Sequence, residues 1–283
     1  MFFLENAEII RNDRVGDGIY ELECSAPEIA GNGDPGQFVH MEVKPYSVES
    51  VSPLLRRPFS LYGVTREQGT ISILYRIRGK GTSILAQVKP GEYLSVLGPL
   101  GRGFTLPAEG SVTLLVGGGM GIAPLVYLAD RLVRLSCDVN VLYGAETASE
   151  LVALDKLQQE GAKCHIATMD GSRGYKGLVT DLLTCISEGE PTRMSTGKQA
   201  CTDIVYSCGP LEMMAHVAKF AKERGIPGEV SLESYMACGV GVCLGCALRL
   251  RNGDASYAKV CSDGPVFSMA EVEFGAGEGE VRQ

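Results

Sequence analysis

The sequence predicts an antiparallel β-barrel followed by a parallel-sheet α/β domain and a small cysteine-rich module. Residues 7 to about 105 hold short alternating or β-branched runs between Gly and Pro turns, which is typical of an antiparallel barrel. From Ser111 onward, strand-like and helix-like segments alternate, as they do in βαβ units. The tail after them is too short to bury much core of its own. We therefore expect domains at residues 1–107, 108–228 and 229–283.

Element boundaries follow from where these patterns begin and end. In the barrel we expect strands at 18–23, 38–43 and 70–76, and a short helix at 82–87. In the α/β domain the expected strands are 112–116, 139–143, 163–167 and 203–207. The expected helices are 125–135, 150–160, 180–186 and 211–224. Residues 187–199 are polar and rich in Gly, Pro and Ser, which indicates an exposed insertion without an assigned role.

Composition excludes several classes of function. The chain of 283 residues is 45% hydrophobic and has a formal net charge of -8, so it offers no broad basic surface for nucleic acid or an anionic membrane. No apolar stretch approaches the length of a membrane span. The first five residues lack a basic region, so we expect no secretory signal and a cytoplasmic protein. In a reducing compartment the 10 cysteines favour a metal site or catalytic thiols over disulfides.

Four of the cysteines form a metal-binding pattern near the end of the chain. The spacing is Cys238-x4-Cys243-x2-Cys246-x14-Cys261. The first three match the plant-type [2Fe-2S] loop, which a later cysteine completes. Glycines between the thiolates let the backbone curl tightly around a cluster. The alternatives are a structural zinc site, disfavoured by the x4 gap and by the lack of histidine after His216, and buried free thiols.

Two further patterns suggest nucleotide binding. A glycine loop at 117–124 lies between a buried strand and a helix, where backbone N–H groups and the helix dipole favour a pyrophosphate. The alternative is a tight turn without a ligand. Cys208-Gly209-Pro210 follows a strand at the sheet edge where α/β folds bind ligands, although a lone cysteine is more often a packed small hydrophobe.

Phosphate-binding candidates also occur in the barrel. The run 56–60 combines two arginines, an aromatic ring and a hydroxyl, and the run 79–83 opens a short helix. A solvated arginine pair and a plain turn are the alternatives.

Together these motifs resemble the ferredoxin reductase family, whose members join a flavin-binding barrel carrying Arg-x-aromatic-Ser to a nicotinamide-binding domain. That domain carries Gly-Gly-Gly-x-Gly-x-x-Pro and a late Cys-Gly-Pro. The cysteine tail, with Gly-Val-Gly-Val-Cys-Leu-Gly-Cys and the run 259–267, is similar to that of the electron-transfer subunits of dihydroorotate dehydrogenase B. The resemblance covers nearly the whole chain.

The resemblance implies a role for each motif. FAD would be held by Arg57, Pro58, Phe59, Ser60, Leu74, Tyr75, Arg76, Gly81 and Thr82. The dinucleotide would be received by Gly118, Gly119 and Gly121, with Cys208 as the catalytic residue near the nicotinamide. The metal ligands would be Cys238, Cys243, Cys246 and Cys261. Phe59 departs from the family because it lacks a tyrosine hydroxyl.

The family's activity implies electron transfer between NAD and a partner subunit. That partner would be an FMN-containing catalytic subunit that oxidises dihydroorotate in pyrimidine synthesis, with two copies of each subunit in a heterotetramer. Glu146 follows a strand end without a neighbouring arginine, which favours NAD over NADP. Two alternatives share the motifs in whole or in part. One is a diaphorase-type subunit of a hydrogenase, sulfite reductase or ferredoxin-NADP reductase assembly, and the other is a non-catalytic iron-sulfur sensor.

Overall fold

The computed structural model describes residues 1–44, 52–187, 202–251 and 257–274. Its contacts divide the chain into two compact units. The first contains Met1–Phe104 together with Leu232–Val266, and the second contains Thr105–Ser231 together with the stretch that begins at Phe267. The expected boundaries after residues 107 and 228 lie within a few residues of these breaks. The cysteine-rich stretch belongs to the same unit as the barrel.

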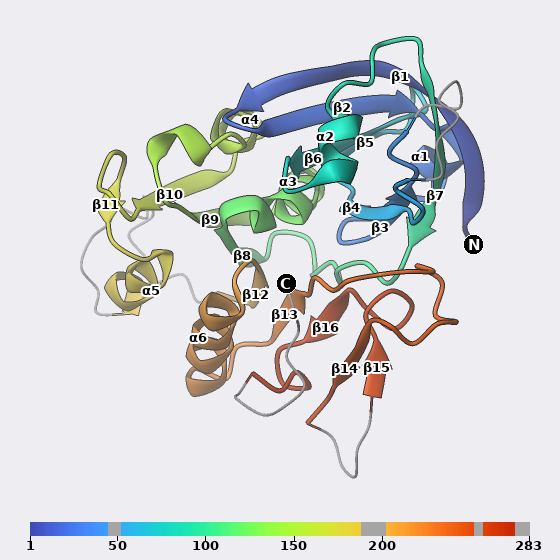
Figure 1. Cartoon of the computed structure of the whole chain (residues 1–283). Helices are drawn as coiled ribbons and strands as arrows, with labels where there is room; N and C mark the ends of the chain where they lie inside the picture. Colours follow the sequence, from blue (N-terminus) through green and yellow to red (C-terminus); the bar gives the residue numbers. More distant parts are fainter. Residues whose placement is uncertain (45–51, 188–201, 252–256, 275–283) are drawn as a thin grey trace. The chain divides into compact units, whose positions relative to one another are not determined.

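The first unit is built on a curled antiparallel sheet with the order β4-β3-β7-β1-β2-β6-β5 (Figure 1). Its strands are β1 (Phe3–Gly16), β2 (Ile19–Ser25), β3 (Phe38–Met41), β4 (Arg57–Ser60), β5 (Gly63–Thr65), β6 (Thr70–Arg76) and β7 (Tyr93–Leu100). Two short helices accompany them, α1 (Pro27–Asn32) and α2 (Lys80–Leu85). The predicted barrel class is confirmed, and strands β2, β3 and β6 lie where the sequence placed them.

Alternating apolar residues close the barrel around a core. Leu22 pairs with Ile73 across β2 and β6, and both side chains are fully buried. The curl brings β4 beside β6, where the rings of Phe59 and Tyr75 lie 5.8 Å apart between centroids. Strand β1 was not predicted, because its exposed positions mix apolar residues such as Leu4 and Ile10 with polar ones, which breaks the alternation, and its pairing with β2 contains two register shifts.

The cysteine-rich stretch forms a two-stranded sheet of β14 (Ala247–Arg249) and β15 (Tyr257–Lys259), and the loops beside this sheet contact the barrel. The N–H of Arg102 donates to the carbonyl of Gly264 at 2.6 Å. A Cβ on Gly101 would lie 2.5 Å from the same carbonyl, so only glycine permits this approach. A two-stranded sheet has little stability alone, so the contacts of its flanking loops with the barrel help to hold it in place.

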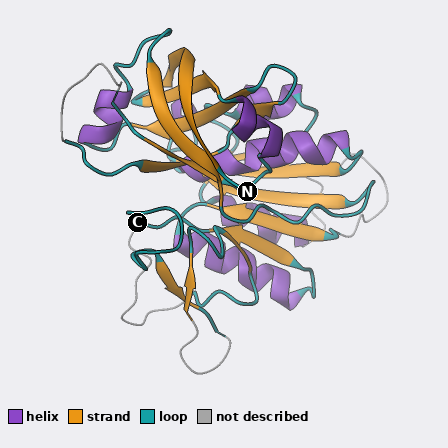
Figure 2. Ribbon diagram, turned by 90° about the vertical axis from the view of Figure 1, so that its right-hand side faces the viewer, coloured by secondary structure: helices purple, strands orange, loops and turns teal. Residues whose placement is uncertain are grey.

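The second unit is a sheet with the order β11-β10-β9-β8-β12-β13-β16, in which β8 to β13 are parallel, and helices lie on both faces (Figure 2). Its strands are β8 (Val112–Gly118), β9 (Asp138–Ala145), β10 (Lys163–Thr168), β11 (Tyr175–Lys176), β12 (Ile204–Cys208), β13 (Gly228–Ser231) and β16 (Val266–Ser268). Its α-helices are α3 (Ile122–Arg134), α4 (Leu154–Gln159), α5 (Val179–Ser187) and α6 (Leu211–Glu223), with 3-10 turns η1 (Gly119–Gly121) and η2 (Ala148–Glu150). Strand order reverses between β8 and β12, and ligands bind at the carboxyl ends beside such a reversal.

All four strands and all four helices expected for this domain are present, with shifted ends. The expected helix 150–160 is broken, because η2 ends at Glu150 and α4 begins only at Leu154. The expected insertion at 187–199 lies outside the described residues after Ser187. Within the described ranges, no helix is long and apolar enough to cross a membrane.

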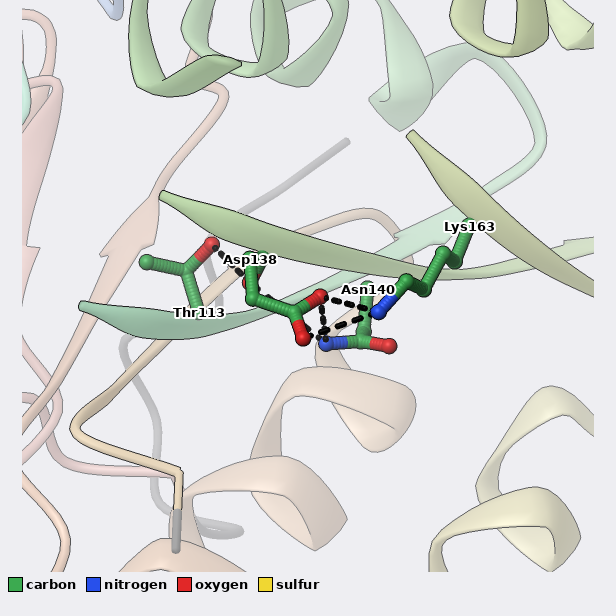
Figure 3. A network of polar contacts seen from close by, with 4 residues as sticks. All are labelled: Thr113, Asp138, Asn140 and Lys163. Carbon is green, nitrogen blue, oxygen red and sulfur yellow. Dashed lines mark hydrogen bonds and ion pairs between the residues drawn. The ribbon is translucent and has the colours of Figure 1, made fainter. Parts of the chain in front are cut away.

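A polar network fixes the amino ends of three central strands, opposite the ligand edge (Figure 3). Lys163 Nζ donates to both carboxylate oxygens of Asp138 at 2.8 Å, which ties β10 to β9. The amide of Asn140, which is 1% exposed, donates to the same carboxylate at 3.2 Å. Thr113 on β8 donates its hydroxyl to the backbone carbonyl of Asp138 at 3.4 Å. The network therefore has a structural role in register rather than a role in binding.

Glu160, at the end of α4, carries a carboxyl group whose ionisation is opposed by burial. One of its carboxylate oxygens is buried without a hydrogen-bond partner among the described residues. Burial raises the pKa of Glu160 to about 7, with Asp130 adding to the rise and Lys156 opposing it. The folded state therefore favours the protonated acid, and ionisation costs stability as pH rises from about 4.5 to 7. We predict that Glu160→Gln stabilises the protein by about 1 kcal/mol at pH 8, after allowance for solvent screening.

The measurement is thermal unfolding of wild type and Glu160→Gln at pH 8 and pH 4.5. The gain should disappear at pH 4.5, where the wild-type carboxyl is already protonated. Glu223→Gln is the matched control, because this carboxylate is exposed at the end of another helix. An equal gain at both pH values would contradict the prediction.

Candidate cofactor-binding and electron-transfer site

Every sulfur of the four predicted metal ligands accepts a backbone N–H. The loop therefore already directs donors at the positions that thiolates and sulfides occupy in an iron-sulfur site. The shortest of these contacts is 3.1 Å, from the N–H of Gly241 to Cys261 Sγ. The other donors are Cys243 to Cys238 Sγ at 3.4 Å, Cys261 to Cys246 Sγ at 3.4 Å, and Gly245 to Cys243 Sγ at 3.5 Å.

Side-chain contacts join the four cysteines two by two, and Cys238 also lies near enough to act on Cys261. The side chain of Cys238 interacts with that of Cys243, and the side chain of Cys261 interacts with that of Cys246. Among the described residues, no three His, Cys, Asp or Glu side chains converge around one metal position. A structural zinc site needs four ligands around one ion, whereas a [2Fe-2S] cluster needs two thiolates on each of two irons. The donor set therefore fits the two-iron cluster.

The two pairs lie in different environments. Cys243 is exposed, while Cys246 and Cys261 are each 2% exposed. Burial opposes ionisation of Cys238, but backbone N–H groups of Cys243, Val240 and Val242 outweigh it and lower its pKa to about 6. Burial and the neighbouring Cys246 raise the pKa of Cys261 to about 12. Cys238 thus forms thiolate readily, whereas Cys261 needs a metal ion to do so.

Two glycines and one histidine shape the start of this loop. Gly239 and Gly241 have φ of 71° and 80°, in the left-handed region that glycine tolerates best. A Cβ on Gly239 would lie 2.6 Å from Nδ1 of His40, which comes from barrel strand β3. Burial, followed by the charge of Arg56, lowers the pKa of His40 to about 4, so the imidazole is neutral at physiological pH. The sequence did not single out His40, because a lone histidine in a strand carries no pattern.

The two arginines of the predicted flavin-binding run make different contacts. Arg57 reaches α2, where a Cβ on Gly81 would lie 3.4 Å from its Nε. The guanidinium and the 79–83 turn, predicted as separate phosphate contacts, are therefore adjacent. Arg56 instead donates to the carbonyl of Ser95 at 2.8 Å and to its hydroxyl at 2.6 Å, and so holds the barrel together. The sequence could not tell which arginine was structural.

Tyr75, in the second predicted FAD segment, has a structural role in the barrel. The hydroxyl of Tyr75 donates to Asn12 Oδ1 at 2.9 Å, and the ring stacks on Tyr20 with centroids 5.6 Å apart. Tyr75 is 3% exposed, and burial raises its pKa. Strand alternation directs Leu74 and Arg76 to the opposite face of β6. The structure thus accounts for Tyr75 through the core, and its predicted role toward FAD stays a prediction.

In the second unit the glycine loop and Cys208 meet, as expected for neighbouring parallel strands. β12 pairs with β8 so that Cys208 lies opposite Gly117. A Cβ on Gly121 would collide with the carbonyl of Cys208, and a Cβ on Gly118 would lie 2.8 Å from Met213 Sδ. Gly119, with φ of 54°, has open space around its Cβ position. Helix α3 begins directly after this turn, and its first N–H groups suit an anion.

At the end of β9, the structure adds residues that the sequence analysis missed. The N–H of Asp170 donates to the carbonyl of Glu146 at 3.2 Å, so the loops after β9 and β10 lie side by side. Hydrogen bonds from Ser172 lower the pKa of Asp170. A second carboxylate thus joins Glu146 at the edge where dinucleotide riboses bind, although exposed Arg173 lies in the same loop. Pairing of parallel strands brings the two loops together, which no local spacing reveals.

Comparison with known proteins assigns the family. Residues 233–273 match the family model described as the iron-sulfur cluster binding domain of dihydroorotate dehydrogenase B, and residues 115–219 match an oxidoreductase NAD-binding domain. An electron transfer subunit of dihydroorotate dehydrogenase B (NAD(+)) from Desulforamulus reducens is 41% identical over 94% of this chain and 97% of its own length. The chain belongs to the family of dihydroorotate dehydrogenase B electron transfer subunits. A second member, from Bacillus caldolyticus, is 40% identical over 91% of this chain and 94% of its own.

Solved structures agree with this assignment. A structure described as an NADH-dependent reduced ferredoxin-NADP oxidoreductase superposes with a TM-score of 0.79 and 28% identity, covering 95% of this chain and 90% of the other. A ferredoxin NADP+ reductase from Neisseria gonorrhoeae with bound FAD and NADP shares the fold at a TM-score of 0.62 and 18% identity, covering 78% and 92% of the two chains. The predicted family and the predicted FAD, [2Fe-2S] and NAD are confirmed. The chain is an NAD-dependent flavin and iron-sulfur oxidoreductase subunit.

The contact between the glycine loop and Cys208 leads to a prediction for electron transfer subunits of this family. Gly121→Ala places a methyl group against the backbone of Cys208, so the two loops must separate. We expect destabilisation by about 1–3 kcal/mol and a large rise in the KM for NADH in flavin reduction. Unfolding curves and stopped-flow bleaching of the flavin measure the two effects.

Gly110→Ala serves as the control. Gly110 also has positive φ, at 79°, but its Cβ position is open. Gly110→Ala should lower the free energy of unfolding without changing the KM for NADH. An unchanged KM in Gly121→Ala would contradict the assignment of this loop to the dinucleotide.

Proposed function

We propose that the chain passes electrons between NAD and an FMN-containing dihydroorotate dehydrogenase catalytic subunit, through FAD and the [2Fe-2S] cluster, in the cytoplasm. The complex would contain two copies of each subunit. One observation carries this proposal: the cysteine loop and the flavin-binding run occur in one compact unit, with His40 of β3 against Gly239 of the loop. A cluster held there has a short path to a flavin and an exposed side for a partner.

Each group of site residues has a separate role in binding. Arg57, together with Gly81 and Thr82, binds the pyrophosphate of FAD, and Ser60 lies near the flavin ring. Gly118, Gly119 and Gly121 receive the nicotinamide dinucleotide, and Cys208 orients its nicotinamide. When bound, FAD links the two-electron chemistry of nicotinamide to the one-electron chemistry of the cluster. The chain's own residues bind and orient these groups and exclude water, and no residue of a dihydroorotate site was recognised in the sequence.

The exposed apolar residues beside Cys243 supply the docking surface for the catalytic subunit. Val242, directly before Cys243, is 78% exposed, and Leu244, directly after it, is 63% exposed. Leu244 also has φ of 61°, a left-handed conformation that a bulky residue rarely adopts. A glycine would relieve that strain, so an exposed leucine at this position favours a contact surface over a structural role.

The docking surface gives a direct test. Leu244→Asp and Val242→Asp should weaken the complex with the catalytic subunit at least 10-fold, because a buried unpaired charge is costly at an interface. NADH should still reduce the flavin at the wild-type rate. Leu178→Asp is the matched control, since Leu178 is also exposed, at 53%, but belongs to the other unit.

Affinity is measured by titration calorimetry or by gel filtration of the mixed subunits. Wild-type affinity in both docking variants would place the partner elsewhere. Loss of NADH–flavin reduction in these variants would show general damage rather than lost docking.

A second experiment tests the proposed reaction itself. The tagged chain is purified from its source, and the complex is given dihydroorotate and NAD. Reduction of NAD by a complex that contains FMN supports the proposal. A partner without FMN, or no reaction, favours the diaphorase-type alternative. A purified chain whose flavin does not bleach with NADH favours the sensor alternative.

A further inference from the structure

His40 lies on the outer face of the barrel, between the flavin-binding run and the cysteine loop. It pairs with Pro58 across strands β3 and β4, so the two side chains share one face. Phe59 and Val39 pair on the other face, toward the barrel core. The imidazole is nevertheless 1% exposed.

The surroundings of the imidazole come from both cofactor segments. A Cβ on Gly239 would lie 2.6 Å from Nδ1 and 3.2 Å from Cε1 of the ring. The backbone of Cys238 faces the ring from the loop, and the backbone of Arg56 faces it from the flavin-binding run. Across the described part of the chain, neither ring nitrogen makes a hydrogen bond of normal length.

A buried imidazole whose backbone partners, Arg56 and Cys238, lie beyond normal hydrogen-bond length requires an explanation. Leaving a buried donor unsatisfied normally costs stability, and such groups in native proteins often reflect a bound group or a functional task. An apolar side chain of similar size would fill this space without that cost. The neutral ring carries one N–H, and the loop that it touches contains the first metal ligand.

We propose that His40 is a positioning residue for the cluster, which holds the Cys238–Gly239 turn against the flavin-binding strand pair and directs its ring N–H to the Cys238 side of the bound cluster. This inference rests on the proposed function, because it requires a cluster on the four cysteines. A hydrogen bond to a cluster sulfur or its ligand stabilises the reduced, more negative state and so raises the reduction potential. His40 therefore sets both the retention and the potential of the cluster.

The experiment compares His40→Asn, His40→Gln and His40→Leu in the full-length protein with its cofactors. Asn keeps a donor near the Nδ1 position, which is the nitrogen nearest Gly239, whereas Gln extends it to the Nε2 position and Leu removes it. The readouts are the reduction potential of the cluster, the EPR spectrum of the reduced cluster, and the rate of iron loss to a chelator. His216→Leu is the control, because His216 lies on α6 in the other unit and bonds only to its own helix at 2.7 Å.

We expect His40→Leu to lower the reduction potential, alter the EPR spectrum and release iron about 10-fold faster. His40→Asn should remain close to wild type, with His40→Gln between the two. FAD content and bleaching of the flavin by NADH should stay unchanged in all variants. If His40→Leu does not fold, the test rests on whether His40→Asn and His40→Gln differ in reduction potential, EPR spectrum and rate of iron loss.

Three outcomes would overturn the inference. One is a cluster with wild-type potential and spectrum in His40→Leu, which would make His40 a space-filling residue. Another is an equal effect of Asn and Gln, which would remove the link to Nδ1. A wild-type protein without a [2Fe-2S] signal would overturn the proposed function as well, and so the two failures can be told apart.

Discussion

The close approach of the cysteine loop to the barrel is the constraint on which the rest of the structure depends. The stretch from Leu232 to Val266 has one small sheet and too few apolar residues for a core of its own, so it uses the barrel surface. Glycines make this possible. A side chain at Gly36 would lie 2.8 Å from Val266, and one at Gly239 would overlap His40. A cluster held this way is fixed to its host and cannot act as a detachable carrier.

This attachment also gives the cluster site two different sides. Cys246 and Cys261 are buried toward the host, while Cys243 is exposed beside Val242 and Leu244. The flavin-binding barrel and the cysteine loop form one compact unit, and the nicotinamide-binding sheet forms the other. On the proposed function, the residues that would hold FAD and those that would hold the cluster therefore belong to the same unit, which suits one-electron exchange because it depends steeply on distance.

The sequence predicted those features that depend on local spacing. The four cysteines, the glycine loop and the alternation of strands and helices each have a signature within a short window. It could not predict features that arise from long-range packing. Arg56 and Arg57 are adjacent and identical in type, yet one secures Ser95 and the other reaches Gly81. The structural tie of Tyr75 to Asn12 and the contact of His40 with the loop were likewise hidden, because each joins segments far apart in the chain.

Packing requires two of the glycines in the loop of the second unit. A dinucleotide-binding loop needs glycine where the backbone approaches a phosphate, but Gly118 and Gly121 here are also required by the β12 loop. Their Cβ positions meet Met213 Sδ and the carbonyl of Cys208. Gly119 alone has open space, and its positive φ turns the chain into α3. Of Gly118, Gly119 and Gly121, only Gly119 therefore combines a positive φ with open space that a ligand could approach. Two of the glycines thus serve the contact between the loops, which lies at the carboxyl ends of β8 and β12 beside Cys208.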